Sequence, residues 1–275
     1  MASVKSSADA TLPRTGPVDR NLNRVEPQPR IRSIGPSDLR IALSNGIADF
    51  AVMPTYAIFV VLIYPIVGLV LLRLTFGYEL LPLVFPLAAG FPLIGPLAAV
   101  GLYELSRRRE QGLEISWSAM RDLRSEAIRD ILAVGVLLLA IFVAWIGAAM
   151  TIYRMTFGDW VPPSLAEFAN AVLTTSAGWT LIVVGCCVGL LFAIAAFSVS
   201  VVSIPLLLDR NVGFGAAVAT SVRAVLANPV TMALWGFIVA SALLLGSIPF
   251  FIGLAVVLPV LGHATWHLYR RVAGY

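Results

Sequence analysis

Residues 131–153 read ILAVGVLLLAIFVAWIGAAMTIY, a run without a single charged side chain. About 20 apolar residues are enough for a helix to cross the roughly 30 Å of hydrocarbon in a bilayer. Only a helix satisfies the backbone hydrogen bonds of such a run in lipid, because the sequence lacks the alternation of a barrel strand. The run therefore predicts a transmembrane helix.

Five further stretches have the same character, which predicts an all-α membrane protein with six spans. The predicted spans are 53–72, 80–102, 131–153, 178–207, 230–247 and 249–268. The composition agrees, because apolar residues make up 59% of the chain and charged residues 12%, against roughly 45–50% and 25% in soluble domains. The fourth stretch is long enough to tilt or to extend beyond the bilayer.

The nineteen Lys and Arg residues predict the orientation. Seven precede the first span, six lie between the second and third, two lie between the fourth and fifth, and two follow the sixth. Only Arg73 and Arg154 fall on the other side. Basic residues are retained on the cytoplasmic side during insertion, so both chain ends are expected there. The net charge of +4 is explained by this orientation and by attraction to anionic headgroups, without a nucleic-acid partner.

The polar segments divide the chain into a tail and a membrane domain. Residues 1–34 combine several prolines and basic residues with few apolar ones, which predicts a disordered cytoplasmic tail. Residues 35–271 form the six-span domain. On the outer side, Ser164 and Glu167 have the spacing of a capping box, which predicts a short helix from Leu165 to about Leu173.

Three cytoplasmic segments resemble one another. Residues 37–50, 116–130 and 213–228 place apolar residues at helical spacing opposite polar ones, and each leads into an odd-numbered span. They predict amphipathic helices at the membrane interface. Because the even-numbered spans also end alike, the chain can be a threefold repeat of interfacial helix, span, outer turn and span. Alternatively, such faint similarity arises by chance in any bundle of membrane hairpins.

His263 and His267 are the only histidines, one helical turn apart. Two histidines at this spacing can share a metal or a haem. Packing or an interfacial role is the competing interpretation, because no further ligand lies at the same depth. Cys186 and Cys187 are adjacent and lack the spacing of a metal or redox motif. We therefore expect no cofactor.

Small residues and prolines mark two spans. Gly185 and Gly189 predict a close helix-packing surface, inside the bundle or between subunits. Four prolines interrupt the second span, at positions 82, 86, 92 and 96. They predict a bent or broken helix, which either exposes backbone to a substrate pathway or serves packing alone.

Asp209 and Arg210 follow the fourth span, which we expect to stop at Pro205 because a proline ring weakens the final turns. Asp209 is then held where the headgroups begin, and a carboxylate there requires a partner. One interpretation is an anchor in which Arg210, or the arginines ending the other even spans, pair with Asp209. The alternative is a solvated turn without a partner.

The ends of the even spans carry a family resemblance. They read GLYELSRR from Gly101, SIPLLLDR from Ser203 and GHATWHLYR from Gly262. Together they resemble the bacterial membrane-protein family called domain of unknown function 2189, over residues 34–271. The resemblance implies a bacterial inner (plasma) membrane. Some members carry a cytochrome c oxidase label, but two histidines cannot supply the six haem and copper ligands of its catalytic subunit.

No motif predicts an enzyme, and no acidic residue falls at membrane depth as ion-coupled transport usually requires. The favoured function is therefore a non-catalytic accessory or scaffold protein, with a respiratory complex as the partner that the family label implies. The alternative is a passive transporter or lipid-handling permease that uses the broken second span. The oligomeric state is left open by the sequence.

Overall fold

The computed structural model describes residues 29–53, 68, 81–83, 85–87, 95–115, 124–248 and 252–273. The described residues form helices and connecting turns, with no β-strand among them. In chain order these are α1 (Pro36–Val52), η2 (Leu81–Leu83), α4 (Gly95–Ala98), α5 (Val100–Glu110), α6 (Ser125–Phe157), α7 (Leu165–Thr174), α8 (Ser176–Ser200), α9 (Ser203–Asp209), α10 (Phe214–Ala227), α11 (Pro229–Ser247) and α12 (Leu254–Ala273). The predicted all-α class is confirmed.

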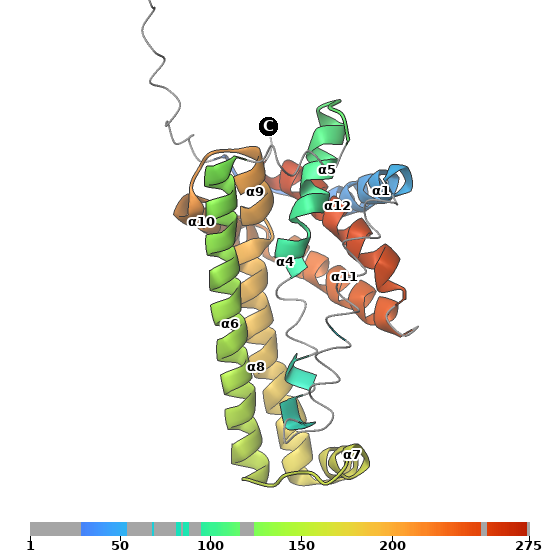
Figure 1. Cartoon of the computed structure of the whole chain (residues 1–275), viewed down its shortest axis with the longest axis vertical. Helices are drawn as coiled ribbons and strands as arrows, with labels where there is room; N and C mark the ends of the chain where they lie inside the picture. Colours follow the sequence, from blue (N-terminus) through green and yellow to red (C-terminus); the bar gives the residue numbers. More distant parts are fainter. Residues whose placement is uncertain are drawn as a thin grey trace, which may run out of the picture.

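A long hairpin of α6 and α8 is the largest feature of the molecule, and α7 connects the two helices at one end (Figure 1). At the other end, α1, α5, α9, α10 and α12 gather around the beginning of α6. We call this region the polar end, because the ion pairs described below lie there. α11 and α12 run obliquely between the polar end and the middle of the molecule.

Three helices in the described part of the chain are long and apolar enough to cross a membrane. They are Ser125–Phe157, Ser176–Asp209 (α8 with α9) and Pro229–Ser247, which cover the third, fourth and fifth predicted spans. α12 corresponds to the sixth but is not among these three. The first predicted span lies outside the described residues except at positions 53 and 68, and the second is described at 81–83, 85–87 and 95–102. The tail up to residue 28 also lies outside the described residues.

Local signals explain where several helices begin and end. Ser164 Oγ accepts a hydrogen bond from the Glu167 amide at 3.2 Å, and this cap begins the short helix α7 as predicted. Pro229 occupies the first turn of α11, where a missing amide proton costs nothing. α6 ends at Gly158, whose φ of 65° is a conformation that glycine adopts without strain.

The fourth span is interrupted earlier than expected. The prediction that it stops at Pro205 is wrong, because the break falls at Val201 and Val202 and α9 then continues through Pro205 to Asp209. A proline ring clashes with the carbonyl four residues earlier, which is that of Val201. The Val202 amide instead donates to Ser221 Oγ of α10 at 3.1 Å, so α10 supports the break.

The amphipathic segments 37–50 and 213–228 form helices, α1 and α10. Of segment 116–130, residues 116–123 lie outside the described residues, and the rest begins α6 without interruption. Residues shortly before α1 are held in place: the Ile34 amide donates to Asn228 Oδ1 at 2.8 Å, and the Arg32 amide donates to the Val272 carbonyl at 2.8 Å. Arg32 and Ile34, at the end of the predicted tail, are therefore hydrogen-bonded to residues of the membrane domain.

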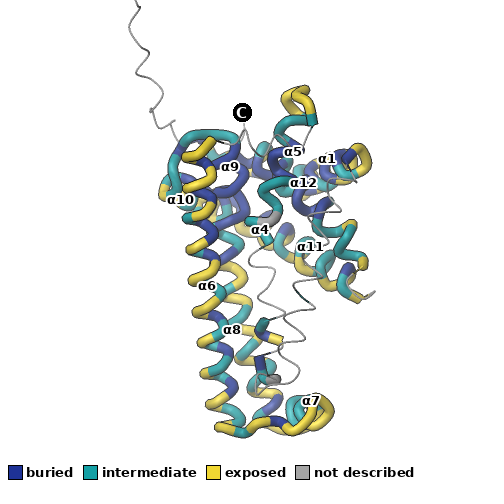
Figure 2. The backbone as a smooth tube through the Cα atoms, viewed as in Figure 1, coloured by how far each residue is buried: buried dark blue, intermediate teal, exposed yellow. Residues whose placement is uncertain are grey.

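Burial separates the two ends of the molecule (Figure 2). Fully buried side chains concentrate at the polar end, where Trp266, Tyr269 and the leucines of α9 pack together. Along the α6–α8 hairpin many apolar side chains are exposed instead, such as Val136 at 68% and Leu191 at 66%. In water such a surface would aggregate, whereas in lipid it is the expected outer face of a membrane helix.

Candidate functional site

The candidate site lies where α1, α5 and α12 meet, and two glycines allow the helices to approach. A β-carbon on Gly46 of α1 would lie 2.6 Å from the Ala264 backbone nitrogen of α12. A β-carbon on Gly262 would lie 2.5 Å from the Leu102 side chain of α5. Small residues let backbones cross closely in membrane helices. Side chains one turn away from these crossings are therefore enclosed.

Asp49, one turn after Gly46, is the centre of the site and is only 4% exposed. Its Oδ2 accepts from Ser106 Oγ at 2.5 Å and lies 2.9 Å from His267 Nε2. Its Oδ1 accepts from Arg109 Nη1 at 2.5 Å. Burial raises the pKa of Asp49, but the hydrogen bonds from His267 and Ser106 outweigh this and lower the pKa below its ordinary value. Asp49 is therefore an ionised carboxylate at neutral pH.

His263 completes the network, because its Nδ1 lies 2.7 Å from Ser106 Oγ. A serine hydroxyl carries one proton, and Ser106 donates it to Asp49. The network therefore assigns the imidazole proton to His263 Nδ1, which donates to Ser106. The other nitrogen, His263 Nε2, is buried and has no hydrogen-bond partner among the described residues.

The two histidines approach the same carboxylate at different distances, with His267 Nε2 2.9 Å and His263 Nδ1 4.0 Å from Asp49 Oδ2. His267 Nε2 is directed at Asp49, whereas His263 Nδ1 is directed at Ser106. Within the described part of the chain, no group of three or more His, Cys, Asp or Glu side chains could hold a metal ion. Cys186 and Cys187 are free thiols on the exposed surface of α8.

The combination of Ser106, His263 and Asp49 has the composition of a catalytic triad but a different order. In a triad the histidine accepts the serine proton and the carboxylate orients the histidine. Here the serine donates to the carboxylate and accepts from the histidine. Ser106 is also only 1% exposed, so its hydroxyl is neither activated nor accessible. The geometry is that of an ion network with a buried carboxylate and hydroxyl, which reaches solvent at the Arg109 side chain.

A second cluster joins α5, α9 and α12 beside the first. Asp209 accepts from Tyr269 Oη at 2.6 Å and from Arg270 Nη1 at 3.3 Å. Glu110 accepts from Arg270 Nε and from Trp266 Nε1, each at 3.0 Å. Burial raises the pKa of the Tyr269 phenol, and the neighbouring Asp209 raises it further. The phenol therefore stays a hydrogen-bond donor to Asp209.

The basic end of α5 is paired within its own helix as well. Glu104 is 1% exposed and accepts two hydrogen bonds from Arg107, each at 2.8 Å, and one from Arg108 at 3.0 Å. The hydrogen bond with Glu104 raises the pKa of Arg107, despite partial burial, and the charge of Asp209 adds to the increase. The polar ends of α5, α9 and α12 thus form one connected set of charges.

The residues singled out from the sequence fall in different places. Pro205, Asp209 and Arg210 belong to the second cluster or its supporting helix, and Asp209 has the partner that the anchor interpretation requires. That interpretation stays a prediction. Gly189 of α8 lies against Trp145 of α6, since a β-carbon there would be 3.0 Å from the indole. One turn away, a β-carbon on Gly185 would meet open space.

Sequence reasoning missed Asp49, Ser106 and Arg109. The helical spacing of segment 37–50 places Asp49 on its polar face, opposite an apolar face that includes Ile47. The structure reverses part of this assignment, because Asp49 is buried and Ile47 is 55% exposed. The signal that could have found the site is the pair of small residues Ala42 and Gly46, which predicts a close helix crossing on the face that carries Asp49.

The family comparison agrees with this membrane architecture. Residues 84–209 match the model of a family described as "Predicted integral membrane protein (DUF2189)". This is the family predicted from the ends of the even spans. The matched region contains α4 to α9, and therefore the α6–α8 hairpin, the Glu104 pairs and Asp209. Comparison with curated proteins and with solved structures finds no match.

Proposed function

We propose that the protein is a six-span membrane protein of the bacterial inner membrane that binds or holds together other membrane components without catalysing a reaction. The observation that carries the proposal is the closed ion network at the polar end. Asp49, Glu104, Glu110 and Asp209 each bind an arginine of the same chain. Charges paired in this way hold helices together, and the two most buried carboxylates, Asp49 and Glu104, are 4% and 1% exposed.

The arrangement of the helices supports the proposed topology. The basic ends of α5 and α12 and the amphipathic helices α1 and α10 share the polar end, whereas α7 lies at the far end of the hairpin (Figure 1). This is the distribution that the basic-residue asymmetry requires if the polar end is cytoplasmic. The meeting of α5, α9 and α12 also supports the threefold repeat, because each helix ends an even-numbered span.

Cysteine labelling tests this topology. We expect Cys introduced at Ser6 to be protected from a membrane-impermeant reagent in intact cells, and Cys introduced at Ala166 to react with it. Cys186 and Cys187 are replaced by Ser beforehand, so that only the introduced thiol is read. Labelling of the Ser6 position from outside intact cells would contradict the proposed orientation.

The hairpin offers the surface for a membrane partner. Exposed apolar side chains follow one stripe of α6, namely Leu132, Val136, Leu139 and Val143, which are between 51% and 68% exposed. Such a stripe contacts either lipid or the apolar helix of another membrane protein. The family label makes a respiratory complex the first partner class to examine.

Photo-crosslinking separates these two surroundings. A photoreactive residue is placed at Val136 on α6, and the matched position is Leu191 on α8, which is equally exposed. We expect a defined protein adduct from one of the two positions in intact membranes, identified by mass spectrometry after gentle purification. Lipid adducts alone from both positions, with no protein retained, would contradict the scaffold and favour the lipid-handling alternative.

A further inference from the structure

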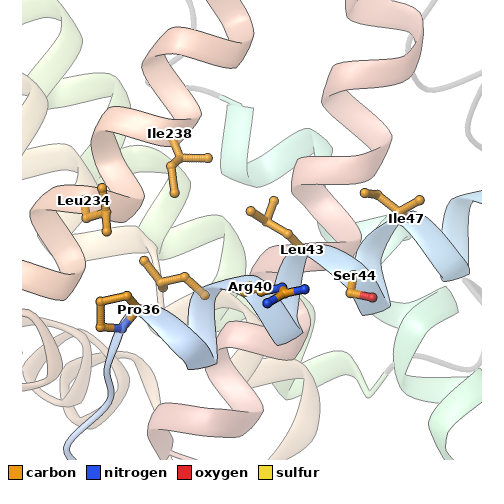
Figure 3. A pocket seen from close by; sticks show the side chains of 8 residues that line it. Pro36, Arg40, Leu43, Ser44, Ile47, Leu234 and Ile238 are labelled. Carbon is orange, nitrogen blue, oxygen red and sulfur yellow. The ribbon is translucent and has the colours of Figure 1, made fainter.

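A shallow groove between α1 and α11 is separate from the ion network (Figure 3). It encloses about 380 Å³, within the roughly 300–1,000 Å³ of small-molecule sites. Its wall is apolar, with Leu43 and Ile47 from α1 and Leu234 and Ile238 from α11. The groove can therefore hold a hydrocarbon chain.

Two polar side chains stand on the α1 side of the groove. Arg40 and Ser44 are one helical turn apart and both exposed, so they share a face of the helix. The Arg40 guanidinium makes no hydrogen bond or ion pair within the described part of the chain. Arg107 and Arg109, by contrast, bind carboxylates. A cation that is not paired internally is available for a ligand.

The position of the groove relates it to the bilayer. α11 is one of the helices able to cross a membrane, and Leu234 and Ile238 lie one turn apart along it. α1 lies at the polar end and contacts α11 (Figures 1 and 3). A chain lying along α11 would thus have its polar head beside Arg40 and Ser44.

We propose that this groove binds an anionic phospholipid, with one acyl chain against Leu234 and Ile238 and the phosphate at Arg40 and Ser44. A guanidinium and a hydroxyl are matched donors for phosphate oxygens. A zwitterionic lipid such as phosphatidylcholine also carries a phosphate, but its quaternary ammonium group offsets the negative charge that attracts Arg40. A soluble anion would satisfy only the two polar side chains. The site is independent of whether the protein also has a protein partner.

Native mass spectrometry of the full chain in detergent tests the site, with phosphatidylglycerol and phosphatidylcholine of identical acyl chains as probes. We expect retention of phosphatidylglycerol over phosphatidylcholine. Arg40→Gln removes one basic contact and should weaken phosphatidylglycerol retention about fivefold. Leu234→Trp fills the groove and should abolish retention of the lipid.

Matched variants distinguish the groove from general lipid adhesion. Arg154→Gln removes an exposed arginine at the far end of α6, and Leu245→Trp adds the same bulk to α11 outside the groove; both should bind phosphatidylglycerol as the parent does. Equal retention by Arg40→Gln and Arg154→Gln would overturn the proposal, as would equal retention of the two lipids by the parent. A dimer that dissociates in Leu234→Trp would also overturn it, because a second copy would then occupy the groove.

Discussion

The polar end and the α6–α8 hairpin differ in the kind of side chain that they bury. At the polar end carboxylates are enclosed, with Glu104 at 1% exposure and Asp49 at 4%, whereas the hairpin turns leucines and valines outward. Burial of a charge is costly unless it is paired, and each of these carboxylates has an arginine. Apolar burial alone cannot hold helices together in lipid, because the lipid tails are apolar too. Each region therefore uses another interaction.

The two interactions differ in strength and in range. The polar end depends on ion pairs and hydrogen bonds between four helices, α1, α5, α9 and α12. The hairpin depends on close contact between neighbouring helices, such as Trp145 with Gly189 and with the Phe192 ring, whose centroid lies 5.8 Å from that of Trp145. The predictions below test whether the polar end is the more sensitive of the two regions.

Asp49→Asn should have the largest effect. It leaves Arg109 and His267 without their carboxylate, and removal of one partner from a buried ion pair costs about 3 kcal/mol. The midpoint of thermal unfolding in detergent should therefore fall by roughly 5–10 °C. Asp159→Asn, in the exposed turn after α6, is the matched control and should change little. Equal midpoints for the two variants would show that the Asp49 ion pair contributes little to thermal stability.

The same carboxylate makes stability depend on pH. The folded state lowers the pKa of Asp49 below 3.8, so its contribution is fully present above the unfolded pKa and is lost as the pH falls through the folded pKa. The difference in unfolding midpoint between the parent and Asp49→Asn should persist down to about pH 5 and shrink below pH 3.8. A difference that stays constant in strong acid would show that charge is not its origin.

Asp209 and Arg270 should show a smaller, measurable coupling. Their side chains are 10% and 25% exposed and 3.3 Å apart, so we expect about 1 kcal/mol. A double-mutant cycle of Asp209→Asn with Arg270→Gln measures it through unfolding midpoints. The cycle with Arg154→Gln, at the far end of the hairpin, should be additive. Additivity in both cycles would favour the solvated turn over the anchor.

The smallest effect is expected inside the hairpin, where two glycines of α8 provide their own control. Gly189→Ala places a methyl group 3.0 Å from Trp145 and should cost less than about 1 kcal/mol, because an indole can shift. Gly185→Ala meets open space and should be neutral or stabilising, since alanine favours the helix by up to about 1 kcal/mol. If instead Gly185→Ala disrupts an oligomer, the glycine pair serves a contact between subunits.

Local signals were readable from the sequence, and contacts between distant segments were not. The cap at Ser164 acts within a few residues and the fifth span is one apolar run, so α7 and α11 were predicted nearly to their ends. Segment 37–50 forms a helix as predicted, but its apolar stripe did not identify which face of α1 is buried. Hydrophobic periodicity assumes that apolar residues face inward, whereas near lipid Ile47 can point outward while α12 packs on Gly46 instead.

The candidate site residues show the same contrast between local signals and distant contacts. Asp209 was found because its position after an apolar run demanded a partner, although its partner could not be chosen between several arginines. His263 and His267 were singled out by their spacing, which is compatible with a shared metal but also with packing or an interfacial role. Their actual partners, Ser106 and Asp49, come from two other helices, and no spacing within α12 reports them.

The contact between Asp49 and His267 also governs when the fold can be completed. The two residues are 218 positions apart, and ribosomes add about 5–20 residues per second. For roughly 10–40 s after α1 emerges, its carboxylate must therefore wait for the helix that will enclose it. A chain that stops before residue 267 never supplies that helix. Such a product can hold Asp49 only against Ser106 and Arg109 of α5, without the histidine that completes its contacts.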